Sequence, residues 1–152
     1  MQSITELNKR KVQLFVEAVW NRGRLELIDQ LVAADYVGHV PSLDPAVIGP
    51  EGVRRLVSSH RGAHPDLYVK IEDQIAEDDR VVTRWHAMTA GSPLARSALA
   101  EPTPCCSGIT IIRLLAGKQV DEHTQYTRLA RPEPDPIRRT ALPWSGERFE
   151  LR

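Results

Sequence analysis

Residues 108–128 read GITIIRLLAGKQVDEHTQYTR, and this stretch decides the fold of the chain. Runs rich in β-branched residues stand on both sides of Ala116 and Gly117, and glycine is a common turn residue. The pattern therefore predicts two antiparallel strands that are joined by a tight turn. In a regular hairpin Leu115 then pairs with Lys118, and the earlier and later residues pair in step.

This register assigns every side chain of the hairpin to one of two faces, because side chains alternate along a strand. It places Ile112 opposite Asp121, and Thr110 opposite His123. One face carries Gly108, Thr110, Ile112, Gln119, Asp121, His123 and Gln125. The other face carries Ile109, Ile111, Arg113, Val120, Glu122, Thr124 and Tyr126. Whether Asp121 and His123 can take part in chemistry depends on which of these faces the rest of the protein covers.

The composition indicates one domain and excludes several classes of function. A chain of 152 residues can bury a hydrophobic core without disulfides or a structural metal. Lysine plus arginine and aspartate plus glutamate number 20 each, so no net charge attracts nucleic acid or an anionic membrane. No apolar run approaches the length of a membrane span, and the N-terminus lacks a signal-peptide core.

The two cysteines, Cys105 and Cys106, are adjacent in the sequence. On a regular strand their side chains would point to opposite faces. Such a pair suits neither an ordinary disulfide nor a zinc site. The expectation is a reduced, cytoplasmic protein.

Three helices are predicted before Pro65. Ser3 and Glu6 have the spacing of a capping box, which opens the first helix. Its buried stripe follows the i, i+3, i+4, i+7 pattern in Val12, Phe15, Val16 and Val19. A shorter helix is predicted from Leu25, Ile28, Leu31 and Val32, and a third begins at Pro50, because proline suits the first helical position. A short extended piece, residues 35–39, and a loop, residues 41–49, lie between the second and third helices.

After residue 65 the apolar period changes from about 3.6 to two, which predicts strands at residues 67–75 and 81–88. With the hairpin they form a four-stranded antiparallel meander after three helices. The predicted fold class is α+β, with three N-terminal helices packed on a curved antiparallel sheet over residues 1–130. Residues 131–152 form a proline-rich tail that cannot bury enough surface to fold alone, although Trp144 and Phe149 favour docking on a neighbour.

Several short motifs resemble those of one known family. They are Val19-Trp20-Asn21-Arg22-Gly23, Asp35-Tyr36-Val37-Gly38-His39, Gly49-Pro50-Glu51-Gly52-Val53, His64-Pro65-Asp66-Leu67, Asp79-Arg80-Val81 and Gly117-Lys118. Their order and spacing over roughly residues 6–129 are similar to those of SnoaL-like proteins. This is the polyketide and ester cyclase branch of the nuclear-transport-factor-like cone fold. The resemblance implies a conical pocket between the concave face of the sheet and the helices, with acid–base residues on the last strands.

The last strand of this family usually reads Gly-Lys-Ile-x-Glu-x-Trp and ends with an aspartate. The resemblance matches its inward acid to Asp121, while His123 replaces a large aromatic residue and Thr127 replaces the later carboxylate. The family's Gly-x-His segment after the second long strand is missing here. On the third helix, His60 and His64 stand where phenylalanines are common.

Asp121, His123 and His39 are the predicted catalytic residues. Asp121 and His123 would share one strand face at a separation of ~7 Å, where they could move a proton to and from a substrate. His39 ends the short extended piece after the second helix, and the resemblance puts it at the pocket mouth. Hydrophobicity alone favours the alternative, in which the isoleucine-rich face of the hairpin is the core and Asp121 is solvated.

The predicted substrate-binding residues are Phe15, Trp20, Tyr36, His60, Arg84, Trp85 and Gln125. The aromatic ones suit a flat apolar ligand, and Arg84 could bind an oxyanion, although each also has an ordinary structural explanation. His60 and His64 have the i, i+4 spacing of metal ligands, but no nearby carboxylate motif completes a set. No metal site is predicted.

The resemblance implies a small enzyme that acts on a hydrophobic, polyketide-like carbonyl compound by general acid–base catalysis without a cofactor. Aldol-type cyclisation or isomerisation is the expected reaction. Two alternatives stay open: water addition to an epoxide, and a non-catalytic module of the same fold that binds a small ligand. The partners expected are the small molecule and a second copy of the chain, bound through the sheet face that the pocket does not use.

Overall fold

The computed structural model describes residues 1–41, 43–89 and 103–129. The elements in order are the helices α1 (Ile4–Leu14), the π-helix η1 (Phe15–Asn21), the short 3-10 helix η2 (Leu25–Leu27) and α2 (Ile28–Leu31), then β1 (Val32–His39), β2 (Val47–Ile48), α3 (Gly49–Ala63), β3 (Tyr68–Glu77), β4 (Arg80–Thr89), β5 (Thr103–Leu115) and β6 (Lys118–Arg128). The predicted tail, residues 131–152 with Trp144 and Phe149, lies outside the described residues, as do residues 90–102 between β4 and β5.

The strands form one six-stranded sheet in the order β2-β1-β6-β5-β4-β3. Neighbours from β3 to β6 are antiparallel, so the predicted meander is confirmed. The sheet is mixed, however, because β1 pairs in parallel with β6 and β2 pairs antiparallel with β1. The extended piece predicted at residues 35–39 is therefore the second half of a longer strand, and the predicted loop contains β2.

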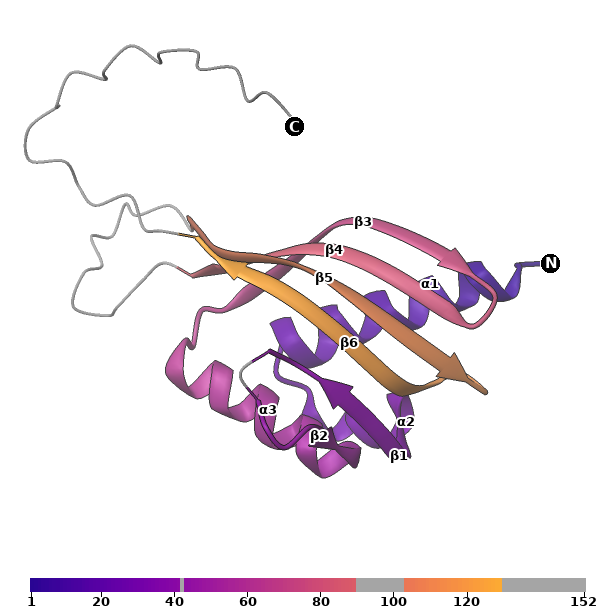
Figure 1. Cartoon of the computed structure of the whole chain (residues 1–152), viewed down its shortest axis with the longest axis horizontal. Helices are drawn as coiled ribbons and strands as arrows, with labels where there is room; N and C mark the ends of the chain where they lie inside the picture. Colours follow the sequence, from indigo (N-terminus) through magenta and orange to yellow (C-terminus); the bar gives the residue numbers. More distant parts are fainter. Residues whose placement is uncertain (42, 90–102, 130–152) are drawn as a thin grey trace, which may run out of the picture.

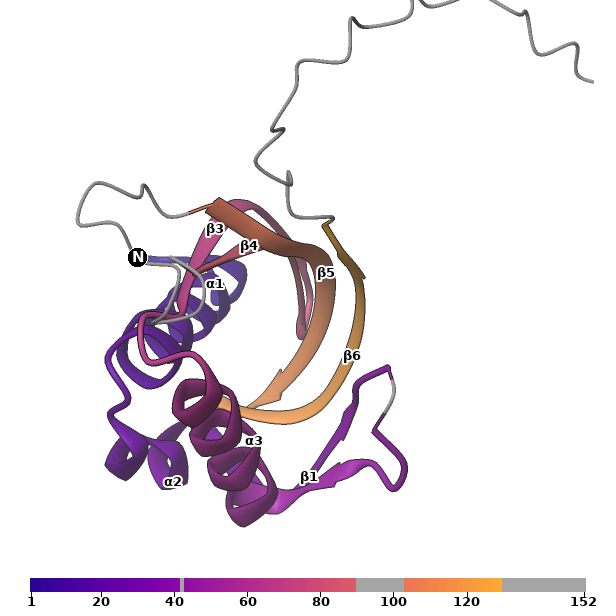
Figure 2. The same cartoon turned by 90° about the vertical axis from the view of Figure 1, so that its left-hand side faces the viewer.

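The sheet curls strongly, and the helices lie on its concave side (Figures 1 and 2). This arrangement confirms the predicted α+β cone. The predicted stripe of the first helix faces the core: Val12, Phe15 and Val19 are buried. The second predicted helix is shorter than expected, because Val32 already has extended backbone and starts β1.

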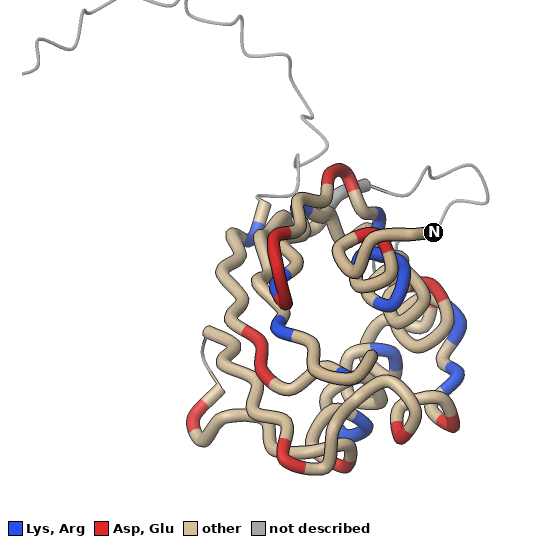
Figure 3. The backbone as a smooth tube through the Cα atoms, turned by 90° about the vertical axis from the view of Figure 1, so that its right-hand side faces the viewer, with Lys and Arg blue, Asp and Glu red and all other residues tan. Residues whose placement is uncertain are grey.

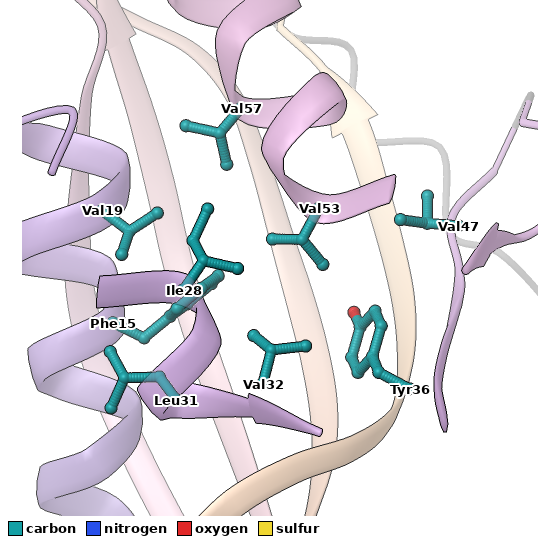
Figure 4. Close-up of a cluster of buried hydrophobic side chains, with 9 residues drawn as sticks. All are labelled: Phe15, Val19, Ile28, Leu31, Val32, Tyr36, Val47, Val53 and Val57. Atoms are coloured by element: carbon teal, nitrogen blue, oxygen red, sulfur yellow. The ribbon is translucent and has the colours of Figure 1, made fainter. Parts of the chain in front are cut away.

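The largest apolar cluster joins η1, α2, α3 and β1 (Figure 4). Its members are Phe15, Val19, Ile28, Leu31, Val32, Tyr36, Val47, Val53 and Val57. A second cluster packs α1 against the concave face of strands β4 and β5. Its members are Val12, Val81, Ile112 and Leu114. The two clusters hold the helices against the sheet, and residues of both clusters line a cavity between them.

The turn between β5 and β6 has the predicted position. Ala116 and Gly117 both have positive φ, 48° and 77°, which is the geometry of a tight two-residue hairpin turn. Leu115 pairs with Lys118 as expected. The turn sequence therefore fixes the first pairs of the hairpin.

The predicted register is wrong beyond Gln119, because β6 contains a β-bulge. Leu114 pairs with Gln119, but Arg113 pairs with Asp121, so Val120 is an extra residue without a partner. A shift of one residue moves every later side chain to the other face. Ile112 consequently stands opposite Glu122 rather than Asp121, and Thr110 opposite Thr124 rather than His123.

Positive and negative residues are interspersed along the backbone in the view of Figure 3, as the balanced composition predicts. In the described part of the chain, no helix is both long enough and apolar enough to cross a membrane.

Candidate active site

A cavity of about 400 Å³ lies between the concave face of the sheet and the helices. This volume is in the range of small-molecule sites. Its walls are mostly apolar and include Phe15, Val16, Trp20, Leu56, Trp85, Ile112 and Tyr126. The π-helix η1 contributes three of these residues, since Phe15, Val16 and Trp20 all belong to it or begin it. The cone therefore offers a flat, apolar ligand a site with few polar groups.

Glu122 is the acid among the described residues that line the cavity. Both carboxylate oxygens accept a hydrogen bond from the protein: Tyr36 Oη donates to Oε2 at 2.8 Å, and Thr124 Oγ1 donates to Oε1 at 2.7 Å. Each carboxylate oxygen has two lone pairs, so a further proton or donor can still be accepted. These two bonds hold the carboxylate in one orientation against the cavity.

A directed chain of hydrogen bonds leads to Glu122. The indole N–H of Trp85 donates to Thr110 Oγ1 at 2.9 Å, and an indole can only donate. Thr110 and Thr124 are 2.9 Å apart through their hydroxyl oxygens. Thr124 uses its proton toward Glu122, so Thr110 must donate to Thr124. The result is a one-way chain from Trp85 through both threonines to the carboxylate.

Tyr36 connects the site to the core. Its side chain is only 3% exposed and belongs to the apolar cluster. Burial, followed by the neighbouring Glu122 carboxylate, raises the pKa of the Tyr36 phenol far above its ordinary value. The phenol therefore remains protonated and remains a donor to Glu122 at any physiological pH.

Gly38 makes room for this contact. In the parallel pairing of β1 and β6, Gly38 stands opposite Glu122. A methyl group at Gly38 would lie 2.7 Å from the Tyr36 hydroxyl oxygen, closer than two such atoms can approach. The missing side chain thus lets the tyrosine reach across its own strand to the carboxylate.

The three predicted catalytic residues lie elsewhere. Asp121, His123 and His39 are not among the residues that line the cavity. Asp121 stands opposite Arg113 in the pairing of β5 with β6. His123 is exposed and stacks on His39, with the ring centroids 4.6 Å apart. The bulge at Val120 is the physical reason, because it turns Asp121 and His123 to the outer face of the sheet.

The predicted binding residues divide into two groups. Phe15, Trp20, His60 and Trp85 line the cavity, and Tyr36 reaches the site through its hydroxyl. Arg84 and Gln125 are exposed and lie outside the lining, where they flank Ile109 on the outer face. Their predicted position is wrong for the same geometric reason: alternation along β4 and the bulge in β6 point them away from the cone.

Sequence reasoning missed Glu122, Thr124 and Thr110 as a unit. The hairpin pattern put Thr110 on the correct face but assigned Glu122 and Thr124 to the opposite one. The available signal was the spacing of two between Glu122 and Thr124, which puts both side chains on one face of a strand. The unpaired residue Val120 reversed the face to which they were assigned.

Gly108 makes room for the Trp85 indole. In the structure a methyl group there would lie 2.5 Å from Cζ2 of Trp85 and 2.8 Å from the carbonyl oxygen of Gln125. The space above Gly108 is therefore taken by the Trp85 indole, which is held in place for its bond to Thr110.

Cys105 and Cys106 both line the cavity, contrary to the expectation of opposite faces. A register shift pairs Ala87 with Cys106 and Met88 with Pro104, so Cys105 is an extra residue on β5 that stands opposite no residue of β4. Burial, and then Cys105, raises the pKa of the Cys106 thiol to about 11. A thiol that holds its proton at neutral pH is a poor nucleophile. In the described part of the chain, no three histidine, cysteine or acidic side chains are grouped to hold a metal ion.

The fold and the site together define a cone-fold protein with an oriented carboxylate in an apolar cavity. The sequence profile of the SnoaL-like polyketide cyclase family matches residues 10–130, and the chain belongs to this family. A candidate polyketide cyclase from Acidithiobacillus ferrooxidans has the same fold, with a TM-score of 0.68 and 22% identity over 84% of this chain and 92% of that one. AclR, a candidate hydroxylase from Streptomyces galilaeus, superposes with a TM-score of 0.63 and 22% identity over 81% of this chain and 90% of that one.

A curated relative is a terpentedienyl-diphosphate synthase from Kitasatospora griseola. It is 28% identical over 117 residues, which cover 69% of this chain but only 23% of that protein. The chain thus spans less than a quarter of the length of this relative. Among the solved structures, identities near 22% show a shared fold, which on its own does not specify a reaction.

Proposed function

We propose that this protein is an enzyme that acts on a hydrophobic, polyketide-like carbonyl compound, with Glu122 as its general acid–base residue. The observation that carries the proposal is a carboxylate held by two donors in a largely apolar cavity. Oriented carboxylates in such cavities are common acid–base groups. Membership of the SnoaL-like polyketide cyclase family supports the same class of reaction.

The reaction that fits this site is a proton transfer followed by carbon–carbon bond formation. The Glu122 carboxylate removes a proton from the carbon next to a carbonyl, and the C–H electron pair becomes an enolate. The enolate carbon attacks a second carbonyl of the same molecule and closes a ring. The protonated Glu122 then returns its proton to the new alkoxide, so the product is an isomer of the substrate and no external reactant is consumed.

Tyr36 and Thr124 position Glu122 in this scheme. Each donates a hydrogen bond to a different oxygen, which limits rotation of the carboxylate. The Tyr36 phenol keeps its proton because its pKa is raised by burial, so it orients the carboxylate without competing for the substrate proton. The apolar walls would exclude water from the enolate.

Water addition to an epoxide fits the site less well. That reaction needs a second acid besides the carboxylate that activates water, and Glu122 is the acid among the described lining residues. The cavity also has a volume of about 400 Å³, which the described side chains leave open for a substrate. Cyclisation or isomerisation is therefore the function that we propose.

The test is proton abstraction from a carbonyl compound in D₂O. A panel of aryl methyl ketones and aryl β-diketones is incubated with the protein, and deuterium exchange at the α-carbon is followed by NMR. Glu122→Gln should reduce the enzymatic exchange rate by ~10²–10⁴, because general acid–base groups typically contribute this much. Asp121→Asn is the matched control, since it neutralises the neighbouring acid on the other face of the same strand.

Full exchange activity in Glu122→Gln would contradict the assignment of Glu122. Loss of activity in Asp121→Asn with a retained melting temperature would return the site to the outer face. A protein that binds the ketones tightly without exchanging any of them would be a ligand-binding module instead.

A further inference from the structure

The two ends of the cavity carry opposite charges. Glu122 and Arg128 both line it, and both project from the same face of β6. They are six residues apart, which corresponds to ~20 Å of strand at ~3.3 Å per residue. Thr124 and Tyr126 lie between them on the same face. The cavity therefore has the Glu122 carboxylate at its inner end and the Arg128 guanidinium at the end where β6 finishes.

Arg128 has no acid to neutralise it among the described residues. Its partner in the β5–β6 pairing is Cys106, whose thiol is uncharged because its pKa is raised to about 11. Arg113, by contrast, binds Asp79 at 2.7 Å, and Arg22 binds Glu17 at 3.1 Å. Arg128 is exposed on the cavity wall, and unlike these two arginines it has no described acid bound to its donors.

The C-terminal part of α3 adds two histidines to the same cavity, His60 and His64. The Nδ1–H of His60 donates to the carbonyl oxygen of Leu56 at 2.9 Å, and the ring stands edge-on to Trp20 at 5.7 Å. These contacts fix the ring. The other ring nitrogen, Nε2, remains available to a ligand.

The middle of the cavity is apolar, so charge discrimination falls to its ends. An anionic group near Glu122 would meet a like charge in a site of low dielectric, which is unfavourable. The same group near Arg128 would gain charge-assisted hydrogen bonds from a planar guanidinium, whose fork of donors matches the two oxygens of a carboxylate. A ligand with an anionic end thus has one favourable orientation, with that end away from Glu122.

We propose that Arg128 forms a carboxylate-binding subsite, and that the natural substrate is an elongated apolar carbonyl compound with a carboxylate at the end remote from the reacting carbon. This inference rests on the proposed function, because Glu122 defines the reacting end. It adds the chemical class of the substrate and the direction in which the substrate lies. Arg128 is a binding residue in this scheme, and it takes no part in the proton transfer.

The experiment uses the fluorescent probe N-phenyl-1-naphthylamine, which is apolar and reports occupation of the cavity. Two competitors that differ by one group displace it: 9-anthracenecarboxylate and its methyl ester. The wild-type protein should bind the carboxylate more tightly than the ester. Arg128→Gln should weaken carboxylate binding about tenfold, the value of one good charge-assisted hydrogen bond, and should leave ester binding within twofold.

Arg84→Gln is the matched control, because it removes the same charge from an exposed position outside the cavity lining. It should leave both competitors unchanged. A melting curve for each variant verifies that the fold is intact. If the probe binds and the wild-type protein prefers the ester, or if Arg128→Gln and Arg84→Gln behave alike, the subsite is refuted while the proposed function stands. If neither the probe nor the competitors bind, the cavity is not an apolar ligand site, and the proposed function fails together with the subsite.

Discussion

The two faces of β6 beyond Val120 carry similar chemistry in very different surroundings. Each has one carboxylate, Glu122 on the inner face and Asp121 on the outer face. Glu122 lies against an apolar cavity with two hydrogen-bond donors, whereas Asp121 lies beside Arg113 on the outside of the sheet. Residue type alone therefore does not distinguish the two carboxylates. Their surroundings do, because Glu122 faces the cavity and is oriented by two donors, whereas Asp121 lies on the outer face.

The outer face also has a histidine pair that would attract attention in the sequence. His39 and His123 stack on each other from neighbouring parallel strands, with ring planes 19° apart. Both are exposed and neither lines the cavity. The comparison shows that a cluster of reactive residue types can be a surface feature of the sheet.

The largest effect that separates the two faces concerns activity. Tyr36→Phe and Thr124→Val each remove one donor to Glu122 and should lower turnover by ~10–100-fold, because a hydrogen bond to a charged group is worth ~1.5–3 kcal/mol. On the outer face, Asp121→Asn and His123→Gln should change turnover by less than about twofold. Steady-state kinetics on a ketone identified by the exchange assay measure both sets. Equal losses on the two faces would mean that orientation of Glu122 does not matter for the reaction.

The next effect concerns packing on the inner face. Gly108→Ala should destabilise the fold by ~1–3 kcal/mol, because the new methyl group would overlap the Trp85 indole and the Gln125 carbonyl. Gly62→Ala is the control, since no atom lies within 4 Å of a methyl group at that position in α3. It should stabilise the protein by ~0.5–1 kcal/mol, as alanine does inside a helix. Urea unfolding measures both, and a Gly108→Ala variant as stable as the wild type would show that Trp85 is free to move.

A smaller effect appears at alkaline pH. Burial raises the pKa of Tyr36 in the folded state, so the unfolded state releases this proton first, at about pH 10. Stability is therefore unaffected by Tyr36 below pH 10 and falls above it, by ~1.4 kcal/mol per pH unit for one group. Tyr36→Phe should remove this part of the loss between pH 10 and 11, whereas Tyr68→Phe, an exposed position, should not. Urea unfolding at pH 9, 10 and 11 provides the comparison. If the free energy of unfolding falls equally with pH in the two variants, the phenol of Tyr36 is not the buried group that we describe.

The substitution with the smallest effect on the stability of the subunit lies on the outer face of the sheet. Ile75, Ile109 and Ile111 are exposed there, 66%, 47% and 40% respectively, which supports the proposal of a homodimer through this face. Ile111→Lys should convert the dimer to a monomer in analytical ultracentrifugation and leave the melting temperature of the subunit nearly unchanged. Leu14→Lys, at a similarly exposed position on α1, should leave the dimer intact. A wild-type protein that sediments as a monomer at all concentrations would exclude this interface.

Much of the fold could be predicted from short stretches of sequence. The stripe through Val12, Phe15 and Val19 marks the buried side of the first helix, and these residues are buried. The residues Ala116 and Gly117 place the turn, because few residue pairs adopt positive φ at two successive positions. These features depend on local geometry, so local sequence is sufficient to predict them.

The site depends on two features that local sequence does not specify. One is the bulge at Val120, which turns Glu122 inward and Asp121 outward. The other is the parallel pairing of β1 with β6, which brings Tyr36 and Gly38 to Glu122 across a sequence separation of 86 residues for the Tyr36–Glu122 bond. A bulge costs little by itself and follows from the curvature that the whole sheet needs to close around the helices. Local sequence was thus sufficient for the first helix, the meander from β3 to β6 and the hairpin turn, whereas the closure of the cone placed Glu122 rather than Asp121 at the cavity.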